Sequence, residues 1–204
     1  MLRIKRSLLL VLKELQLIRI VLSCLNPFLC IMSELLDRLA NIRAFIFDID
    51  GVLTSGRVLV TEEGHMLRSV NIKDGFALQH AVKAGYPVAI ISGGKSEGMR
   101  KRFEGLGLKH IYLSQSHKAE AFQQLLETWN LPAEQILYMG DDMPDMPVLR
   151  LAGVAACPAD AANDIRSICA YISPLNGGDG CAREILERVM KLQNRWWDEQ
   201  VHHW

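Results

Sequence analysis

The stretch AFIFDIDGVLT, residues 44–54, decides the fold of this chain. Four apolar residues come first, and Asp48 and Asp50 follow at alternate positions, with Gly51 after them. A short apolar run without polar interruption is typical of a strand that is buried on both faces, as in a parallel sheet covered by helices. The two carboxylates therefore stand where the chain leaves a buried strand, which is where ligand sites of such sheets lie.

Further short apolar runs recur along the chain. They occupy residues 88–91, 136–139 and 154–156, each flanked by glycine or polar residues. Stretches with helical spacing of apolar residues lie at residues 75–84, 97–106, 119–129 and 182–192. This alternation of strands and helices predicts an α/β fold with a doubly wound parallel sheet.

Residues 57–72 interrupt this alternation directly after the first strand. The segment VLVTEEGHMLRSVNI, residues 58–72, has the pattern of two strands around a turn at Glu63 and Gly64. Such a pattern predicts a β-hairpin that projects from the sheet as a flap. We find no insertion large enough for a cap domain.

The composition is that of one ordinary globular domain. The 204 residues include 23 Lys and Arg against 23 Asp and Glu, and half of all residues are hydrophobic. This balance excludes disordered and collagen-like chains, and zero formal net charge gives no global case for a nucleic-acid or membrane partner. The five cysteines are odd in number and form no CxxC pair, which favours reduced thiols and a cytoplasmic location.

The two ends of the chain lie outside the regular pattern. The opening is basic and then apolar, yet none of its apolar runs approaches the ~20 residues that span a bilayer. We interpret residues 1–31 as an N-terminal extension from an upstream start, because Met32 begins a segment in which Ser33 could cap a helix leading into the first strand. The main domain would then be residues 32–195, followed by an aromatic tail at residues 196–204.

Polar groups follow the later strands as well. Ser92, Gly93 and Gly94 come after the second apolar run, and a hydroxyl with flexible backbone amides suits phosphate oxygens. Lys118 stands near the start of a later helix, and GDDMPD, residues 140–145, follows the third apolar run. Because the carboxyl ends of parallel strands meet at one edge of a sheet, these groups are expected to gather at one site.

The segment GDDMPD carries three carboxylates, Asp141, Asp142 and Asp145, within five residues. Carboxylates that share one sheet edge with Asp48 and Asp50 repel one another unless a cation neutralises them. Oxygen ligands without a nearby histidine or cysteine favour Mg²⁺ and disfavour zinc. The sequence therefore predicts a magnesium site.

The motifs occur in the order and spacing of the haloacid dehalogenase superfamily, which the chain resembles from Ile42 to about Leu192. They are DIDGVLT, Ser92, Lys118 and GDDMPD. Within that superfamily, NIKDG at residues 71–75, the lack of a cap insertion and the tail GGDGCARE are similar to the 3-deoxy-D-manno-octulosonate 8-phosphate phosphatases. The resemblance implies a magnesium-dependent phosphatase with a capless core, acting in the synthesis of lipopolysaccharide inner-core precursors. It also implies a homotetramer in which a neighbour's surface helps to close the site.

The resemblance implies a role for each carboxylate. Asp48 would be the nucleophile that attacks phosphorus and forms an aspartyl-phosphate. Asp50 would protonate the departing sugar oxygen and then activate water as a base. Magnesium would be held by the Asp48 carboxylate, the Asp50 backbone carbonyl and Asp141. Asp142 and Asp145 would orient the side chains of Asp141 and Lys118.

The substrate implied by the resemblance is a sugar acid phosphate. Ser92, Gly93 and Lys118 would contact its phosphate oxygens, on which charge is spread during phosphoryl transfer. The residues expected to meet the remainder of the substrate, besides the Asp50 side chain, are Asn71, Ile72, Lys73, Asp74, Gly75 and Arg102.

The chain departs from many relatives at four positions that often hold arginine. Here they are Lys73, Gln79, Gly94 and Asp179. Fewer guanidinium groups weaken bidentate recognition of acid groups, so a nonulosonate 9-phosphate, as in sialic-acid-type metabolism, is an alternative substrate. A non-catalytic phosphosugar-binding module associated with an acylneuraminate cytidylyltransferase is a third interpretation, against which the intact aspartate pair argues.

Two of the substrate contacts also have a simpler interpretation. Arg102 could pair with Glu104 or another surface carboxylate, and Lys73 could be an exposed charge of the hairpin. The sequence alone leaves both interpretations open for these two side chains.

Overall fold

The computed structural model of the protein describes the backbone of residues 27–197 and the side chains of residues 32–197. The chain divides into two compact units, the first ending at Asp37 and the second beginning at Arg38. The site and the sheet belong to the second unit. Within the described part of the chain, no helix combines the length and the apolar character that crossing a membrane requires.

The described residues of the first unit are helical and lie in α2 (Pro27–Asn41), which continues into the second unit. Ser33 lies inside this helix, so the prediction that it caps a helix start is wrong. Serine in a helix interior costs only a fraction of ~1 kcal/mol, so the helix need not begin there. The N-terminal extension predicted for residues 1–31 lies mostly outside the described residues and stays a prediction.

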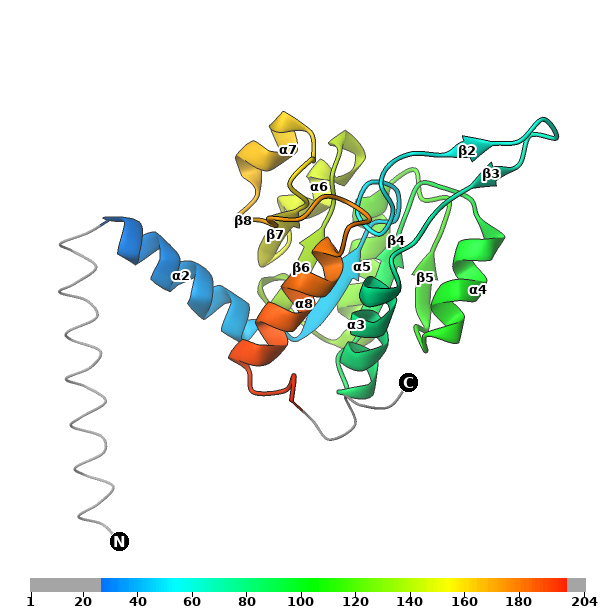
Figure 1. Ribbon diagram of the computed structural model, residues 1–204. Helices are drawn as coiled ribbons and strands as arrows, with labels where there is room; N and C mark the ends of the chain where they lie inside the picture. Colours follow the sequence, from blue (N-terminus) through cyan, green and yellow to red (C-terminus); the bar gives the residue numbers. More distant parts are fainter. Residues whose placement is uncertain (1–26, 198–204) are drawn as a thin grey trace, which may run out of the picture. The chain divides into compact units, whose positions relative to one another are not determined.

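The second unit is built on a six-stranded sheet with the order β5-β4-β1-β6-β7-β8, in which every neighbouring pair is parallel (Figure 1). Strand β1 lies between β4 and β6. Strands β4 and β5 therefore lie on one side of β1, and the later strands β6, β7 and β8 lie on the other. Ligands of such sheets bind beside the point where the strand order reverses. The bounds are β1 (Ala44–Phe47), β4 (Val88–Ile91), β5 (His110–Tyr112), β6 (Ile136–Met139), β7 (Val154–Cys157) and β8 (Tyr171–Ile172).

Helices cover both faces of the sheet, as a doubly wound fold requires. Side chains of α5, α6 and α7 share a buried core with one face, and α3 packs against α8 over the other, with α4 beside α3 (Figure 1). The bounds are α3 (Ile72–Lys83), α4 (Glu97–Gly105), α5 (Lys118–Trp129), α6 (Met146–Leu149), α7 (Asn163–Ile168) and α8 (Cys181–Leu192), with 3₁₀ turns η1 (Ala133–Gln135) and η2 (Met143–Asp145).

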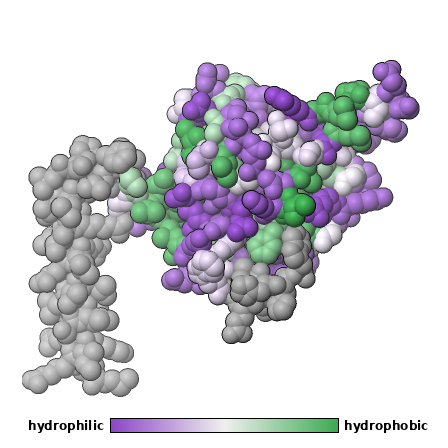
Figure 2. Space-filling model, viewed as in Figure 1, coloured by the Kyte–Doolittle hydropathy of each residue, from purple (hydrophilic) through white to green (hydrophobic). Residues whose placement is uncertain are grey.

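The predicted hairpin is present after β1. Strands β2 (Leu59–Val60) and β3 (Met66–Leu67) form an antiparallel pair that extends from the sheet (Figure 1). The segment continues into α3, which begins three residues earlier than predicted because the Asn71 side chain accepts a hydrogen bond from the Lys73 N–H, 2.9 Å away, and so caps the helix. In Figure 2, apolar atoms gather on the hairpin behind a hydrophilic tip.

The doubly wound α/β fold is confirmed, and the structure adds two edge strands that the sequence pattern did not indicate. Strands β5 and β8 are three and two residues long, and neither is fully buried. Edge strands bury less surface and therefore lack a long apolar run. Trp196, assigned to the tail, is buried against Phe76 and His80 of α3, while residues 198–204 lie outside the described part of the chain.

Candidate active site

Polar residues from three strand ends converge at the carboxyl edge of the sheet. The loops after β1, β4 and β6 meet there with the first turn of α5, around a cavity of about 320 Å³. The residues predicted to bind phosphate and the metal ion all line this cavity. Its lining is Asp48, Asp50, Gly56, Ser92, Gly93, Gly94, Lys118, Asp141, Asp142, Pro144 and Asp145.

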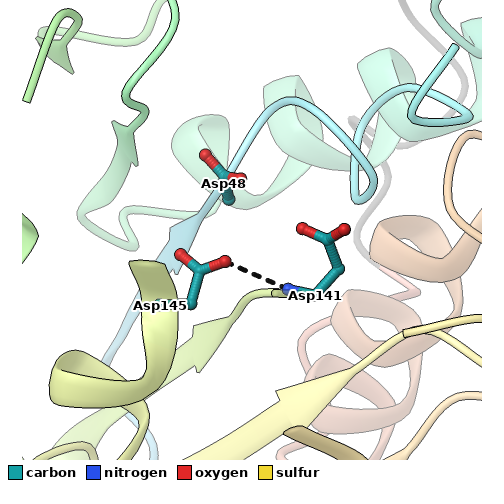
Figure 3. Close-up of side chains that lie close together, drawn as sticks. All are labelled: Asp48, Asp141 and Asp145. Carbon is teal, nitrogen blue, oxygen red and sulfur yellow. Dashed lines mark hydrogen bonds between the residues drawn. The ribbon is translucent and has the colours of Figure 1, made fainter. Parts of the chain in front are cut away.

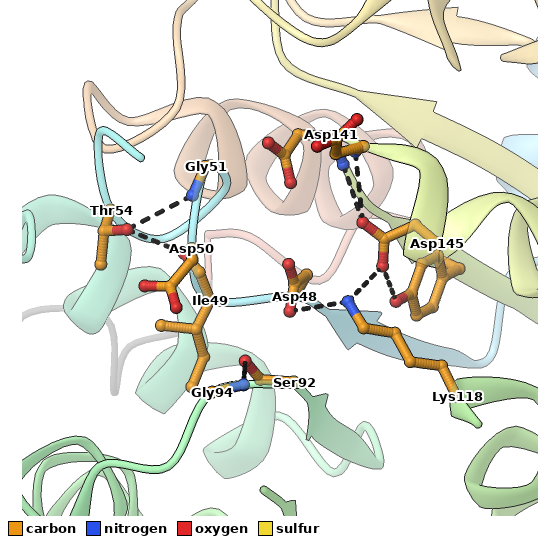
Figure 4. A network of polar contacts seen from close by, with 12 residues as sticks. Asp48, Ile49, Asp50, Gly51, Thr54, Ser92, Gly94, Lys118, Asp141 and Asp145 are labelled. Carbon is orange, nitrogen blue, oxygen red and sulfur yellow. Dashed lines mark hydrogen bonds and ion pairs between the residues drawn. The ribbon is translucent and has the colours of Figure 1, made fainter. Parts of the chain in front are cut away.

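The loop after β1 is held in a fixed conformation by its own polar groups. The N–H of Asp48 donates to the carbonyl of Met139 at 3.0 Å, which extends the β1–β6 pairing by one residue. The hydroxyl of Thr54 accepts from the Gly51 N–H at 3.3 Å and donates to the Ile49 carbonyl at 3.1 Å (Figure 4). These bonds close the loop on itself directly after Asp48.

Lys118 joins two carboxylates at the floor of the cavity. Its ammonium lies 2.6 Å from Oδ1 of Asp145 and 3.0 Å from Oδ1 of Asp48 (Figure 4). Burial lowers the pKa of Lys118, but the charges of the two aspartates outweigh it, so the net shift is upward. The lysine is therefore a permanent positive charge beside the carboxylates.

Asp145 has all its hydrogen-bonding capacity used within the protein. Its Oδ1 accepts from Lys118 and from the hydroxyl of Tyr138, and its Oδ2 accepts from the N–H groups of Asp141 and Asp142 at 3.1 and 3.4 Å. The side chain is buried. Asp145 thus fixes both the lysine and the loop that carries Asp141, as predicted, whereas the Asp142 side chain caps η2 by accepting from the Met143 N–H.

Three carboxylates lie close enough to share a cation. One oxygen from each of Asp48, Asp141 and Asp145 lies within 4.8 Å of the others (Figure 3). Burial, followed by the charge of Asp145, raises the pKa of Asp48 to about 6 and that of Asp141 to about 7. The Asp48 Oδ1 has the lysine as an ion-pair partner but no hydrogen bond of good geometry among the described residues.

These carboxylates fit a hard divalent cation such as Mg²⁺. Because the oxygens of Asp145 are already bonded, Asp48 and Asp141 are the groups free to ligate it. Gly51, at φ +91°, leaves room for the Asp141 side chain, since a Cβ at that position would lie 1.9 Å from Oδ2 of Asp141. An all-oxygen set of this kind is what Mg²⁺ prefers.

The loop after β4 forms the neighbouring wall of the cavity. Ser92 is buried, and its backbone is held by the Tyr112 carbonyl, which accepts its N–H at 2.9 Å, and by the Gln115 N–H, which donates to its carbonyl at 3.0 Å. The Ser92 hydroxyl accepts from the Gly94 N–H at 3.2 Å. Ser92, Gly93 and Gly94 therefore line the same cavity as Lys118.

The side chain of Asp50 is bound by a residue that the sequence analysis did not single out. Arg68, directly after β3, donates from Nε to Oδ1 at 2.6 Å and from Nη2 to Oδ2 at 3.1 Å. Tyr138 was also missed, although a hydroxyl inside a buried apolar strand signals a partner. Arg68 has no such local signal, because its partner lies eighteen residues earlier.

Two of the predicted substrate contacts lie at the start of α3, away from the cavity lining. Asn71 donates from Nδ2 to the Gly178 carbonyl at 3.2 Å. Oδ1 of Asp74 accepts from the Arg183 N–H at 2.7 Å in the first turn of α8. Burial is the first cause that raises the pKa of Asp74 to about 6. Both residues tie α3 to the C-terminal part of the domain.

The other four predicted contacts differ in burial, and Gly75 is the buried one among them. Ile72 and Lys73 are exposed, and Arg102 of α4 places its guanidinium against the backbone of Gly75. None of them lines the cavity. The predicted contact of all six residues with substrate is untested by this geometry and stays a prediction.

Comparison with known proteins agrees with this arrangement. A family model of haloacid dehalogenase-like hydrolases matches residues 110–185. The 3-deoxy-D-manno-octulosonate 8-phosphate phosphatase of Yersinia pestis is 32% identical over 173 residues, which cover 85% of this chain and 91% of the relative.

Solved structures are similar in fold as well as in sequence. The crystal structure of the Yersinia pestis phosphatase matches with a TM-score of 0.77 at 33% identity, covering 78% of this chain and 86% of that one. The Moraxella catarrhalis phosphatase, solved in complex with a magnesium ion, a phosphate ion and 3-deoxy-D-manno-octulosonate, matches with a TM-score of 0.78 at 31% identity, over 81% and 95% of the two chains. By sequence and structure, this chain belongs to the haloacid dehalogenase-like hydrolases, in the family of the 3-deoxy-D-manno-octulosonate 8-phosphate phosphatases.

Proposed function

We propose that this phosphoric monoester hydrolase releases phosphate from 3-deoxy-D-manno-octulosonate 8-phosphate through an aspartyl-phosphate intermediate, with Mg²⁺ as its cofactor. The observation that carries the proposal is the cavity in which Asp48, Lys118 and Asp141 converge beside the Ser92 loop. It offers a nucleophile, a fixed positive charge, oxygen ligands for a cation and hydrogen-bond donors for phosphate. Relatives at 32% identity carry the same activity in their names.

In the first step an Asp48 carboxylate oxygen attacks phosphorus. A bond forms between that oxygen and phosphorus as the bond between phosphorus and the sugar oxygen breaks. Asp50, at the rim of the cavity, gives a proton to the departing sugar oxygen. The sugar acid then leaves as the free alcohol.

In the second step Asp50 takes a proton from water, which attacks the phosphorus of the aspartyl-phosphate. The bond from phosphorus to Asp48 breaks, inorganic phosphate is released, and the Asp48 carboxylate is free again. Throughout both steps, Lys118, the Ser92 hydroxyl and the Gly93 backbone hold the phosphate oxygens. Asp145 keeps the lysine in place.

Asp48 and Asp141 would hold the magnesium ion, together with the backbone carbonyl of Asp50. A bound Mg²⁺ supplies positive charge that lets a carboxylate and a phosphate approach each other. Burial, followed by the charge of Asp145, raises the pKa of both Asp48 and Asp141, and a cation beside the two carboxylates would favour their ionised form.

The sugar-acid part of the substrate would extend from the cavity toward the first turn of α3. Lys73 and Arg102 are the cations among the predicted contacts outside the cavity lining, and Arg102 lies against Gly75. We infer that they meet the acid group of the substrate, with Asn71, Ile72 and Asp74 shaping the same surface.

We also propose that the enzyme is a homotetramer. The hairpin presents apolar side chains to solvent, and groups of this kind in one patch mark an association surface. They are Leu59, Val60, Met66 and Leu67, at 68%, 62%, 57% and 52% exposed. Light scattering coupled to gel filtration should give four times the monomer mass, and Leu59→Asp with Met66→Asp should lower it; a monomeric wild type would contradict the proposal.

The test of the proposed function is phosphate release with Mg²⁺ from a panel of esters. The panel holds the eight-carbon acid 8-phosphate, nine-carbon acid 9-phosphates and hexose phosphates, compared by kcat/KM. We expect the eight-carbon acid to be preferred. Preference for a nine-carbon acid would replace the substrate but keep the mechanism, and no release from any member would overturn the proposed function.

A further inference from the structure

The hairpin contacts Asp50 through a polar pair that the catalytic steps do not use. Arg68 offers the two parallel N–H groups of its guanidinium to the two oxygens of the Asp50 carboxylate, at 2.6 and 3.1 Å. Only 8% of the Arg68 side chain is exposed, against 35% of the Asp50 side chain. A bidentate pair of this kind fixes direction as well as distance, and shielding from water strengthens it.

The loop after β4 leaves the room that this pair occupies. A Cβ on Gly94 would lie 2.9 Å from Oδ2 of Asp50, 3.5 Å from the Ser92 hydroxyl and 3.6 Å from Nη2 of Arg68. Glycine at this position therefore lets the carboxylate rest directly over the phosphate-binding loop (Figure 4). In this conformation a Cβ at position 94 would require Oδ2 of Asp50 to shift.

Nothing else among the described residues holds the Asp50 carboxylate by a hydrogen bond or ion pair, in contrast to Asp145 with its four donors. An aspartate side chain that is one-third exposed at a cavity rim would otherwise sample several rotamers. A displacement of about 1 Å in a reacting group can reduce a rate ~100-fold. The acid and base steps thus depend on what holds this side chain.

We propose that Arg68 is a positioning residue of the reaction: it reaches from the hairpin to fix the Asp50 carboxylate over the phosphate site. This inference rests on the proposed function, in which Asp50 is the acid and base. It makes the hairpin part of the catalytic apparatus within one chain. The hairpin acts through the side chain of Asp50, and its residues, all of which the structure describes, make no hydrogen bond with the carboxylates of Asp48 or Asp141.

The first experiment compares turnover of Arg68→Met with that of the wild type on the sugar acid phosphate, with Mg²⁺. We expect kcat to fall between about 10- and 100-fold while KM stays within about threefold, because the phosphate site is unchanged. Arg68→Lys keeps the charge but not the bidentate geometry, so it should recover part of the loss. Arg57→Met is the matched control, because Arg57 is an exposed arginine at the start of the same hairpin segment; it should stay within about twofold of the wild type.

The second experiment separates an effect through Asp50 from a structural effect. With enzyme in excess over p-nitrophenyl phosphate, the first release of nitrophenolate reports attack by Asp48 alone, because this leaving group departs without a proton. Arg68→Met should keep that rate within about threefold of the wild type while its turnover of the sugar ester falls.

Several results would overturn the inference. An equal loss in the first release and in turnover would place the effect of Arg68 on the nucleophile or the fold, and so would a loss confined to KM. Turnover of Arg68→Met equal to that of Arg57→Met would show that Asp50 needs no such support. A wild type that releases phosphate from neither ester would instead overturn the proposed function, so the two failures are distinguishable.

Discussion

Asp48 and Asp74 are two buried carboxylates that differ in almost nothing but their surroundings. They are 5% and 2% exposed, burial raises the pKa of each to about 6, and each has one oxygen without a hydrogen bond among the described residues. Asp48 forms an ion pair with Lys118 and lies close to Asp141 at the cavity, whereas Asp74 accepts the N–H of Arg183 in the first turn of α8.

The comparison shows that burial and a raised pKa do not by themselves identify a nucleophilic carboxylate. At Asp48 the shift has a second origin, the charge of Asp145, and the groups around it converge on open space that a ligand can fill. At Asp74 the neighbouring donor is a helix N-terminus, which favours negative charge and needs no ligand. Convergence of several polar groups on one cavity distinguishes the two.

The largest effect expected from this comparison is that of Asp48→Asn. The amide cannot attack phosphorus, so kcat/KM for the sugar acid phosphate should fall by about 10³-fold or more. Phosphate release and thermal unfolding measured on the same sample would separate lost chemistry from lost folding. Asp164→Asn, an exposed aspartate of α7, is the matched control and should behave as the wild type. Activity retained by Asp48→Asn would contradict the assignment of the nucleophile.

The next effect is that of removing the metal. EDTA should lower turnover by about 10²-fold or more, and added Mg²⁺ should restore it, because Asp48 and Asp141 repel each other and the phosphate without a cation. Mg²⁺ at 100 times its Kd should also stabilise the folded state by about 2.7 kcal/mol, seen as a higher Tm. Asp141→Asn should lose this rise in Tm, and Asp74→Asn should keep it. A wild-type Tm that does not change when Mg²⁺ is added would contradict the proposed metal site.

Asp74→Asn should change stability and its pH dependence more than turnover. The pKa of Asp74 is raised from 3.8 to about 6 in the folded protein, so its contribution to stability is fully present below pH 3.8 and is lost as pH rises through 6. This amounts to up to about 3 kcal/mol, at 1.36 kcal/mol per pKa unit.

Urea unfolding at pH 4 and pH 7 would test this, with Asp164→Asn again as the control. The wild type should lose more stability between the two pH values than Asp74→Asn does, since other groups titrate alike in both proteins. Turnover should stay within about threefold. A large loss of kcat/KM at unchanged stability would mean that the Asp74 carboxylate contacts the substrate directly and does not only shape the surface around it.

The smallest effect expected is that of Tyr138→Phe, which tests how much the Tyr138 hydroxyl contributes to holding the Asp145 carboxylate beside Asp48. The change removes one of four donors to that carboxylate and leaves the ring volume in place. A hydrogen bond to a charged group is worth about 1.5 kcal/mol or slightly more, so the free energy of unfolding should fall by that amount. Denaturant unfolding would measure it, and no change in stability would mean that the hydroxyl does not support Asp145.

The parts of the site that directly follow a buried strand could be predicted from the sequence, because the strand and the motif after it are both short stretches of the chain. Ala44–Phe47 and Ile136–Met139 are uninterrupted apolar runs, so the strands and the carboxylates that follow them were visible in the pattern. The edge strands His110–Tyr112 and Tyr171–Ile172 were not, because they are short and only partly buried. The cap of α3 by Asn71 was a local signal that was overlooked.

The sequence by itself determined the order of strands and helices and the chemistry available at the carboxyl edge of the sheet. Apolar periodicity and residue type act over a few positions, and a parallel sheet brings strand ends together whatever the loops do. Only the tertiary structure decided which carboxylate is held by what. The Arg68–Asp50 pair, the bonds of Asp145 and the contact of Asp74 with Arg183 join residues up to 109 positions apart, and such pairings depend on how hairpin and helices pack, which no local pattern encodes.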